Sequence, residues 1–342
     1  MSTIPTTFND GLPSYTAVGG GERRASTGLS AVILNRGEEY PRYALFEELK
    51  KAGFDYIISM ESPSSCGDLD ALLSTFPFVR FIILKDKLNG GEEINLAAAE
   101  LSSPLFFVIW NDVRLLRCGG AERMAERLLE KSEDSGSYKR LCTVPVIQDG
   151  RSETIPSLIV PALVREKKHR TEIKTIHFIP EKEGLPSLYP FDGIGIYDRE
   201  RFIRMGGFDP SIKNFYWQLM DFGFRGSLWG EEIASTQLIK LSYEGAIPQG
   251  DSTIGESYRR FFLKNLAPVF RRDYAHIPLR RFASYLRRRG DLFMAWEEFS
   301  SARSWVKTNR YRFVSDAKII ADRFGYFAGN SPEDAAPKDA AP

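Results

Sequence analysis

The stretch LSAVILNRGEEYPRYALFEELKKAGFDYIISM, residues 29–60, sets the expected architecture. LSAVILN (29–35) is a short apolar run that ends in a polar residue, which indicates a buried strand. In the segment that follows, apolar residues recur at helical spacing, and Gly53 stands where a helix would end. FDYIISM (54–60) predicts a second strand. The order strand, helix, strand predicts two parallel strands joined by a crossover helix.

The same alternation continues along the N-terminal half of the chain. The next segments read in turn as helix and strand: 68–76, 79–84, 92–102, 105–112 and 119–131. This pattern predicts an α/β fold, with a mostly parallel, twisted sheet flanked by helices. In such sheets ligands bind beyond the carboxyl ends of the strands. Asn35, Glu61 and Asp112, each at the end of a predicted strand, are therefore the first candidate site residues.

The alternation is lost in the middle of the chain. RLCTVPVIQ (140–148), SLIVPALV and IKTIHFIP are strand-like and interrupted by prolines. A helix that ends near Arg225 and a strand around 237–243 follow. From residue 256 onward the chain reads as helical and basic, with fourteen Lys and Arg against five Asp and Glu in residues 256–312. We therefore expect a C-terminal helical extension on the α/β sheet.

Four regions follow from these patterns. Residues 1–27 and 329–342 are rich in small, polar and proline residues, which predicts disorder. Residues 28–255 form the predicted α/β domain, and residues 256–328 form the basic helical extension.

Composition excludes several classes of protein. The net charge of +1 over 342 residues gives no overall field for nucleic acid. The three cysteines and three histidines are scattered, so the sequence predicts no zinc site. The chain shows neither a secretory signal nor an apolar run long enough for a membrane-spanning helix, and we expect a cytoplasmic protein.

Five segments, in order and at suitable distances, resemble glycosyltransferase family 2, the inverting sugar transferases with a GT-A fold. They are LSAVILNRGEEYPRYALFEEL, DYIISMESPS, LNGGEEINLAAAELSSPLFFVIWNDVRL, VPVIQDG and GIGIYDRERFIRMGGFDP. The resemblance covers roughly residues 28–265. It implies a GT-A-like sheet and transfer of a sugar from a nucleotide-diphosphate sugar to a glycan, lipid or protein acceptor.

The resemblance implies a donor site on the N-terminal strands. Glu61 stands where the family commonly has an Asp that faces the base of the nucleotide. Asn35 matches the Asn after the opening strand, and Asn95 lies on the Asn-bearing helix of the donor region. The alternative roles are a turn residue for Asn35 and helix packing for Asn95.

The metal-binding motif of the family is only partly matched. Trp110, Asn111 and Asp112 fall on its Asp-x-Asp pattern, so Trp110 replaces the first carboxylate. The resemblance implies Asp112 as the ligand of Mg²⁺ or Mn²⁺, cations that accept one or two carboxylates together with substrate phosphates. Trp110 could stack on a sugar or base, or belong to the core.

The position of the catalytic base is altered as well. The family's Glu-Asp pair falls on Gln218 and Leu219, and leucine cannot accept a proton. Asp192 and Asp221 are the candidate catalytic residues, and Asp209 is a weaker third candidate in a Gly-Gly-Phe-Asp-Pro turn. The residues do not decide among them.

The segment ahead of the predicted catalytic helix, and the helix itself, resemble the family's acceptor side. Its candidate residues are Gly206, Gly207, Asp209, Trp217 and Arg225. Arg225 is four residues past Asp221, so the two share a helix face and form an ion pair, which can be structural.

Two functions of different classes remain open at this point. One is a glycosyltransferase that binds a nucleotide-sugar donor. The other is a catalytically inactive protein that keeps the fold as a binding or scaffold module, because both chemical motifs have lost a carboxylate. The basic C-terminal segment indicates a solvated helical face or a peripheral contact with anionic lipid at the inner face of the membrane.

Overall fold

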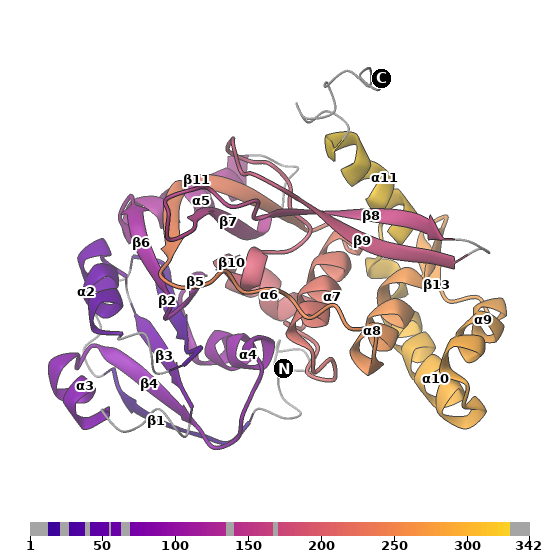
Figure 1. Ribbon diagram of the computed structural model, residues 1–342, viewed down its shortest axis with the longest axis horizontal. Helices are drawn as coiled ribbons and strands as arrows, with labels where there is room; N and C mark the ends of the chain where they lie inside the picture. The colour runs from indigo at the N-terminus through magenta and orange to yellow at the C-terminus, as the bar shows by residue number, and fades with distance from the viewer. Residues whose placement is uncertain are drawn as a thin grey trace, which may run out of the picture.

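A nine-stranded sheet at the centre of the molecule carries the other elements (Figure 1). The computed structural model describes residues 13–20, 27–37, 42–54, 56–62, 69–134, 140–166 and 170–328. The sheet strands are β1 (Tyr15–Gly19), β2 (Leu29–Leu34), β3 (Ile57–Glu61), β4 (Val79–Leu84), β5 (Leu105–Trp110), β6 (Val113–Cys118), β7 (Arg140–Gln148), β10 (Gly195–Asp198) and β11 (Glu232–Tyr243). They lie in the order β1-β4-β3-β2-β5-β10-β7-β11-β6.

Two hairpins stand outside this sheet, and helices occupy many of the connections. The hairpins pair β8 (Leu158–Glu166) with β9 (Arg170–Phe178), and β12 (Val269–Arg271) with β13 (Tyr274–His276). The α-helices are α2 (Tyr43–Ala52), α3 (Leu69–Thr75), α4 (Gly90–Glu100), α5 (Ala121–Asp134), α6 (Arg199–Met205), α7 (Phe215–Leu228), α8 (Glu256–Phe261), α9 (Arg280–Arg289), α10 (Leu292–Thr308) and α11 (Ala317–Ala328). The described chain also has two 3-10 turns, η1 (Phe191–Gly193) and η3 (Arg310–Arg312), and a π-helical turn, η2 (Phe262–Leu266).

The parallel core of the sheet is built by β2, β3, β4 and β5, as the alternating sequence predicts. Every residue of β2 and of β5 is buried, which means that both faces of these strands are covered. β2 pairs with β5 so that Leu34 lies opposite Trp110. The polar residues after the two strands therefore meet at one edge of the sheet.

The second half of the sheet mixes directions. β10 runs antiparallel between β5 and β7, whereas β11 runs parallel to β7. β6 follows β5 directly in the sequence but pairs with β11 at the far edge, and the sequence reasoning missed this strand. Six strands of the nine, β2, β3, β4, β5, β7 and β11, share one direction, and this confirms the mostly parallel α/β sheet.

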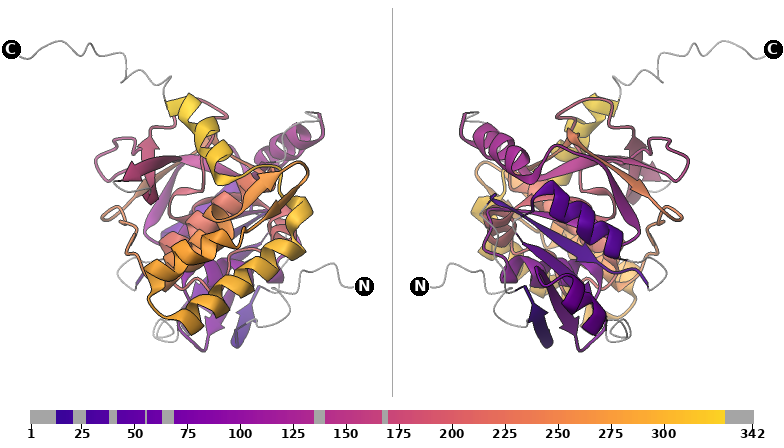
Figure 2. Two further views of the ribbon diagram at one scale, coloured as in Figure 1. Left: turned by 90° about the vertical axis from the view of Figure 1, so that its right-hand side faces the viewer. Right: turned by 90° about the vertical axis from the view of Figure 1, so that its left-hand side faces the viewer.

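Local signals in the sequence account for the ends of the helices on the N-terminal half. α2 ends at Gly53, which adopts the left-handed conformation with φ 79°. Asn89 accepts from the backbone N–H of Glu92 at the start of α4, and the Glu92 side chain accepts from the backbone of Asn89. Figure 2 shows the two ends of the molecule separately, with the indigo N-terminal helices in one view and the orange and yellow C-terminal helices in the other.

The prediction of disorder for residues 1–27 is wrong for part of this range. Residues 15–19 form β1, which pairs antiparallel with β4 at the edge of the sheet. The hydroxyl of Tyr15 also donates to Glu100 on α4 at 2.5 Å. An unpaired sheet edge offers hydrogen bonds even to a segment of low hydrophobicity, and composition alone does not reveal such an edge. Residues 1–12, 21–26 and 329–342, also expected to be disordered, lie outside the described residues.

The C-terminal segment, residues 256–328, packs onto α7 and joins the hydrophobic core of the sheet domain. It contains the expected helices and also the short β12–β13 hairpin. Lys264 is buried where this segment meets α7. Its ammonium lies 2.8 Å from Asp209 Oδ2 and 3.0 Å from Asp221 Oδ1. The ion pairs thus join the C-terminal segment to the loop before α7 and to α7 itself.

We expect Lys264→Met to lower the free energy of unfolding by about 3 kcal/mol, because it leaves two buried carboxylates without their shared cation. Burial raises the pKa of Asp209 and of Asp221, but Lys264 outweighs this, aided by Arg260 at Asp209 and by Arg225 at Asp221, and holds both below the usual range. The stability that depends on these lowered pKa values is present above about pH 4 and lost as the pH falls further.

Urea unfolding of the wild type and the variant from pH 3 to pH 7 tests this. The wild type should lose more stability below pH 4 than Lys264→Met does. Lys307→Met, at an exposed position on α10, is the control and should be neutral. Equal stability of Lys264→Met and the control at pH 7 would contradict the role of the buried cluster.

Candidate functional site

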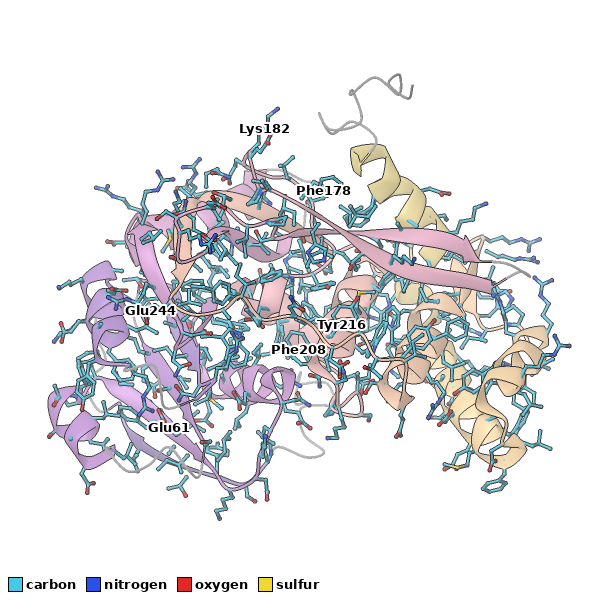
Figure 3. All side chains as sticks on the ribbon, in the orientation of Figure 1. Glu61, Phe178, Lys182, Phe208, Tyr216 and Glu244 are labelled. Carbon is cyan, nitrogen blue, oxygen red and sulfur yellow. The ribbon has the colours of Figure 1, made fainter. Side chains whose placement is uncertain are left out.

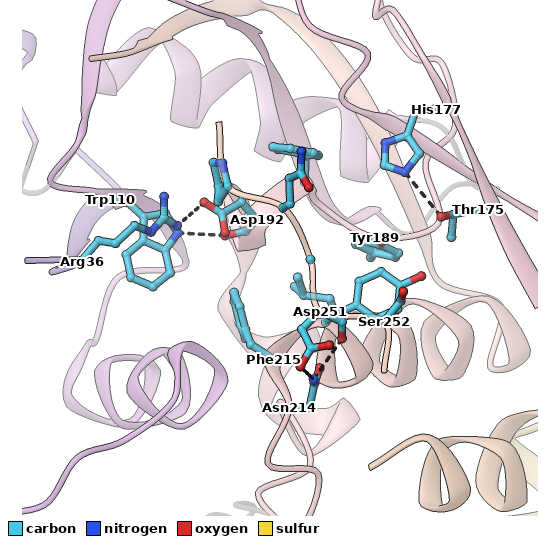
Figure 4. A pocket seen from close by; sticks show the side chains of 16 residues that line it. Arg36, Trp110, Thr175, His177, Tyr189, Asp192, Asn214, Phe215, Asp251 and Ser252 are labelled. Carbon is cyan, nitrogen blue, oxygen red and sulfur yellow. Dashed lines mark hydrogen bonds and ion pairs between the residues drawn. The ribbon is translucent and has the colours of Figure 1, made fainter. Parts of the chain in front are cut away.

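A pocket of about 450 Å³ lies beyond the carboxyl ends of β2 and β5 (Figure 4). It is lined by side chains and backbone of Arg36, Trp110, Thr175, His177, Tyr189, Phe191, Asp192, Asn214, Phe215, Tyr216, Leu219, Pro248, Gln249, Gly250, Asp251 and Ser252. Five of the lining side chains are aromatic, not counting the histidine. In Figure 4 the β9 residues Thr175 and His177 lie across the pocket from Arg36 and Trp110. The pocket therefore joins the edge of the sheet, the start of α7 and the β8–β9 hairpin.

Arg36 is the charged centre of the sheet side of the pocket. One terminal nitrogen of its guanidinium lies 2.9 Å from Asp112 Oδ2, and the other donates to Asp192 Oδ2. The guanidinium also stacks over the indole of Trp110, 4.1 Å from the ring centroid. About a quarter of the side chain, 27%, is exposed, on the pocket side. A cation thus lies between two carboxylates and an aromatic face.

Asp192 is held in a strained backbone conformation. It has φ 54° and ψ 21° within η1, a region that residues other than glycine rarely adopt. The indole N–H of Trp110 donates to its carbonyl at 2.9 Å, and the Tyr243 hydroxyl donates to its Oδ2 at 2.9 Å. Burial raises the pKa of Asp192 to about 6, although Arg36 and Tyr243 each act to lower it. Strain held by surrounding bonds is typical of functional residues.

Asn111 and Asp112 tie the end of β5 to the loop after β2. Asn111 Oδ1 accepts from the backbone N–H of Arg36 at 2.9 Å, and its amide donates to the Gly37 carbonyl at 2.9 Å. Asp112 is 2% exposed, and its Oδ1 is buried without a hydrogen-bond partner among the described residues. The sequence placed Trp110, Asn111 and Asp112 on the donor side, and the structure gathers all three around Arg36.

Glu61 lies in an ion-paired cluster beside the pocket rather than in its lining. Its carboxylate is fully buried, pairs with Arg42, and accepts from Ser59 at 2.6 Å and from Asn35 at 3.2 Å. Asn35 also donates to the Met60 carbonyl. Figure 3 shows Glu61 among the N-terminal strands, away from Tyr216 at the centre of the molecule. The structure therefore brings Asn35 and Glu61 together outside the pocket lining, and their donor-binding role stays a prediction.

Glu93 on α4 is a titratable residue that the sequence reasoning did not select. Burial, followed by the nearby charge of Glu61, raises its pKa to about 8. Its Oε2 is buried without a partner among the described residues. A protonated carboxyl group beside Glu61 can donate a hydrogen bond at neutral pH.

Hydrogen bonds in the interior of the protein, including those of Asn95, hold the segment around Gly207 in place. Asn95 exchanges two hydrogen bonds of 2.8 Å with the backbone of Phe208. The guanidinium of Arg225 donates to the Gly207 carbonyl at 2.6 Å and to the carbonyl of Met205. Gly206 ends α6 in the left-handed conformation, with φ 81°. These residues position the loop before α7, and none of them lines the pocket.

Trp217 and Asp209 do not line the pocket. Trp217 is 4% exposed, and its indole N–H donates to the Thr253 carbonyl at 2.9 Å, which fixes the end of the 248–253 loop. The carboxylate of Asp209 is bound by Arg260 and Lys264 in the interior. Both residues lie near the predicted acceptor side but make structural contacts there.

The structure separates the two predicted catalytic carboxylates. Asp221 is fully buried and is bonded to Arg225, Lys264 and Asn265, so its geometry favours a structural role. Asp192 lines the pocket. Leu219, at the position of the family's base, lines it too, and a Cβ on Gly193 would come within 3.8 Å of its Cδ2. Of the two predicted catalytic carboxylates, Asp192 is therefore the one that lines the pocket.

The sequence reasoning missed the residues that long-range folding brings to the pocket. Arg36 followed a predicted strand, but nothing in its neighbourhood marked it as a ligand. Thr175 and His177 come from a hairpin far along the chain, and burial lowers the pKa of His177, which favours its neutral form. Tyr243 lies at the end of β11. No local motif signals these positions.

The residues present do not fit a conventional divalent metal site. Among the described residues no three Asp, Glu, His or Cys side chains are grouped so that they could hold an ion. Asp112 Oδ1 offers one ligand, but Asp112 Oδ2 and Asp192 Oδ2 are both bonded to Arg36. A divalent cation between the carboxylates would meet the positive guanidinium, and we derive no step through a metal.

The fold is shared with a solved sugar transferase. GalNAc-T7, solved with UDP, GalNAc and Mn²⁺, superposes with a TM-score of 0.57 at 12% identity, over 88% of this chain and 57% of that chain. This likeness shows a GT-A fold, as the sequence predicted. The present chain thus spans little more than half the length of GalNAc-T7.

Two further solved structures give lower scores. Residues 1–349 of TarS from S. aureus match with a TM-score of 0.41 at 12% identity, over 82% of this chain and 73% of that one. The mannosyltransferase PcManGT from Pyrobaculum calidifontis, solved with GDP-Man and Mn²⁺, matches with a TM-score of 0.41 at 10% identity, over 97% of this chain and 81% of that one. No protein-family model matches the sequence. No curated protein is significantly similar to it in sequence.

Proposed function

We propose that the protein is a glycosyltransferase that moves a sugar from a nucleotide-diphosphate sugar to a hydroxyl group of a glycan, lipid or protein. The observation that carries this is the pocket of the GT-A fold, in which Asp192 and Arg36 face a space walled by aromatic side chains. Aromatic faces suit the apolar faces of sugar rings, and the charged pair supplies the acid-base and electrostatic groups that transfer needs.

The donor would lie over the carboxyl ends of the parallel strands. Trp110 and the backbone held by Asn111 would form its floor, with the diphosphate toward Arg36. The Asn35–Glu61 cluster would lie on the nucleotide side. The acceptor would enter past the β8–β9 hairpin and the 248–252 loop, where Tyr189 and Tyr216 add aromatic surface.

Asp192 would be the general base. The acceptor oxygen attacks the anomeric carbon of the donor sugar and forms the new glycosidic bond, while its proton passes to the Asp192 carboxylate. The bond from the anomeric carbon to the diphosphate oxygen breaks, and its electron pair leaves with the nucleoside diphosphate. With a pKa of about 6, the carboxylate is mostly ionised at neutral pH and still basic enough to accept a proton.

GalNAc-T7 was solved with Mn²⁺, and the resemblance implies such a cation at Asp112. The residues around Asp112 do not fit a divalent cation, because Arg36 is bonded to Asp112 and to Asp192. The proposed transfer therefore contains no step that depends on a metal.

Asp192→Asn should lower kcat/KM by about 10²–10⁴-fold, the usual contribution of a general base. For the wild type, kcat/KM should fall as the pH drops below about 6, because protonated Asp192 cannot accept a proton. Tyr243→Phe removes a bond that stabilises the carboxylate, so this acidic limb should move to higher pH. Release of UDP or GDP from a panel of nucleotide sugars, with glycan, lipid and peptide acceptors, measures these effects.

The control for this series is Asp86→Asn, at an exposed position outside the pocket, which should leave kcat/KM unchanged. Unchanged turnover in Asp192→Asn would assign the base elsewhere. If no donor of the panel binds or is turned over, the scaffold function becomes the better explanation of the fold.

We also propose that the α9–α10 hairpin contacts an anionic membrane. No helix in the described ranges combines the length and apolar character of a membrane span. The start of α10, however, exposes the side chains of Leu292, Phe293, Met294 and Trp296, and Phe293 is 79% exposed. Arg280, Arg281 and Arg287 are exposed on the adjoining helix α9. Apolar and basic groups together are typical of peripheral membrane contacts, and Figure 1 shows both helices at one extremity of the molecule. A cytoplasmic location, with this contact at the inner face of the membrane, is part of the same proposal.

The double variant Phe293→Ser/Trp296→Ser should lower binding to vesicles that contain phosphatidylserine by at least about tenfold, because two large apolar side chains no longer leave water. Sedimentation with phosphatidylserine and with pure phosphatidylcholine vesicles measures this. Leu116→Ser, an exposed apolar residue on β6, is the matched control. Equal binding of the double variant and the control would exclude this surface.

A further inference from the structure

The guanidinium of Arg36 is held by three side chains at the edge of the pocket in which we place the donor. Its two terminal nitrogens are bonded to Asp112 and Asp192, and the Trp110 indole covers one face. These two bonds use two of the five N–H groups of an arginine, so N–H groups remain for a ligand. Because 27% of the side chain is exposed and Arg36 lines the pocket, a ligand there can reach it.

The backbone around Arg36 is fixed independently of its side chain. Asn111 binds the N–H of Arg36 and the carbonyl of Gly37, each at 2.9 Å. Asn111 belongs to the turn after β5, so the loop that bears Arg36 is tied to the neighbouring strand. The cation is therefore held before any ligand arrives, which lowers the ordering cost of binding.

The surroundings suit a planar monocation better than a hard divalent ion. Magnesium and manganese prefer several oxygen ligands, whereas a guanidinium uses flat aromatic surface and paired carboxylates. Here an indole stands beside Asp112 and supplies such a surface. At the place where the family has the first carboxylate, this chain has the indole of Trp110, which covers one face of the guanidinium.

We propose that Arg36 binds the diphosphate of the donor and stabilises its departure in place of a divalent cation. The inference rests on the proposed glycosyl transfer. As the bond from the anomeric carbon to the diphosphate oxygen breaks, that oxygen takes the electron pair, and the N–H groups of Arg36 donate to the developing negative charge. Arg36 is held for this by Asp112 and Trp110, while Asp192 receives the acceptor proton.

Isothermal titration with UDP and with GDP tests the inference without any need for the acceptor. For the wild type, the Kd for the preferred nucleotide should be the same within about twofold in excess EDTA and in Mn²⁺. Arg36→Ala should weaken binding in EDTA by about ten- to a hundredfold, as expected for lost charged hydrogen bonds. Arg36→Lys, which keeps a charge but not the planar fork, should lie between the two.

The matched control is Arg114→Ala. Arg114 also bridges two carboxylates, Glu48 and Glu244, but lies outside the pocket lining. Its loss should leave the Kd unchanged. Circular dichroism of each variant shows whether it is folded, and the metal dependence of the wild type tests the inference even if Arg36→Ala is unstable.

A second readout concerns the freed carboxylates. In Arg36→Ala, Asp112 and Asp192 lose their cation and are available to a metal. Titration of free Mn²⁺, followed by electron paramagnetic resonance, should therefore show tighter Mn²⁺ binding by Arg36→Ala than by the wild type or Arg114→Ala. Added Mn²⁺ should also restore part of the lost nucleotide affinity.

The outcomes separate the two proposals. Nucleotide binding that requires Mn²⁺ in the wild type would overturn the role of Arg36 and leave the glycosyltransferase proposal intact. The same holds if Arg36→Ala binds nucleotide as tightly as Arg114→Ala in EDTA. Absence of nucleotide binding in EDTA and in Mn²⁺ would overturn both.

Discussion

The parallel pairing of β2 with β5 is the constraint on which the site depends. Its register sets Leu34 opposite Trp110, so the residues that follow, Arg36 and Asp112, leave the sheet side by side. The pairing is enforced by burial, because every residue of both strands is removed from water. A slip by one residue would turn the buried side chains to the opposite face and separate the ion pair. The chemistry of the pocket thus rests on the packing of apolar strands.

The antiparallel strand β10 adds the second carboxylate to the same edge. Gly195 pairs with Val108 of β5, so the turn just before β10 lies beyond the carboxyl end of β5. That turn is η1, and it presents Asp192 to Arg36 from the side opposite Asp112. A change of strand direction within the sheet therefore brings residues more than 150 positions apart into one charged cluster.

The helix α7, which was expected to carry the base, is part of the core. α7 is buried from Trp217 to Leu228, and the C-terminal segment covers it through Lys264. A carboxylate in such a setting is held by its ionic partners and cannot exchange protons with a substrate in the pocket. The part of α7 that lines the pocket is its N-terminal end, with Phe215, Tyr216 and Leu219.

Local sequence determined the alternating strands and helices from β2 to α5, except for β6, together with the left-handed stop at Gly53 and the candidate residues at the strand ends. These features depend on periodicity and on neighbouring residues, so they can be read without a fold. The resemblance also directed attention to Trp110, Asn111 and Asp112, which do meet around one point.

Only the tertiary structure decided what these residues contact. The sequence left the base unassigned, with Asp192 and Asp221 both as candidates near the acceptor-side segment. Asp221 is buried among cations, which favours a structural role. Asp192 lies in a strained turn that faces the pocket. Arg36 had no local signature at all, because its ionic partners come from the turn after β5 and from η1. Contacts between residues distant in sequence are set by strand order and register, and the composition of each segment does not encode them.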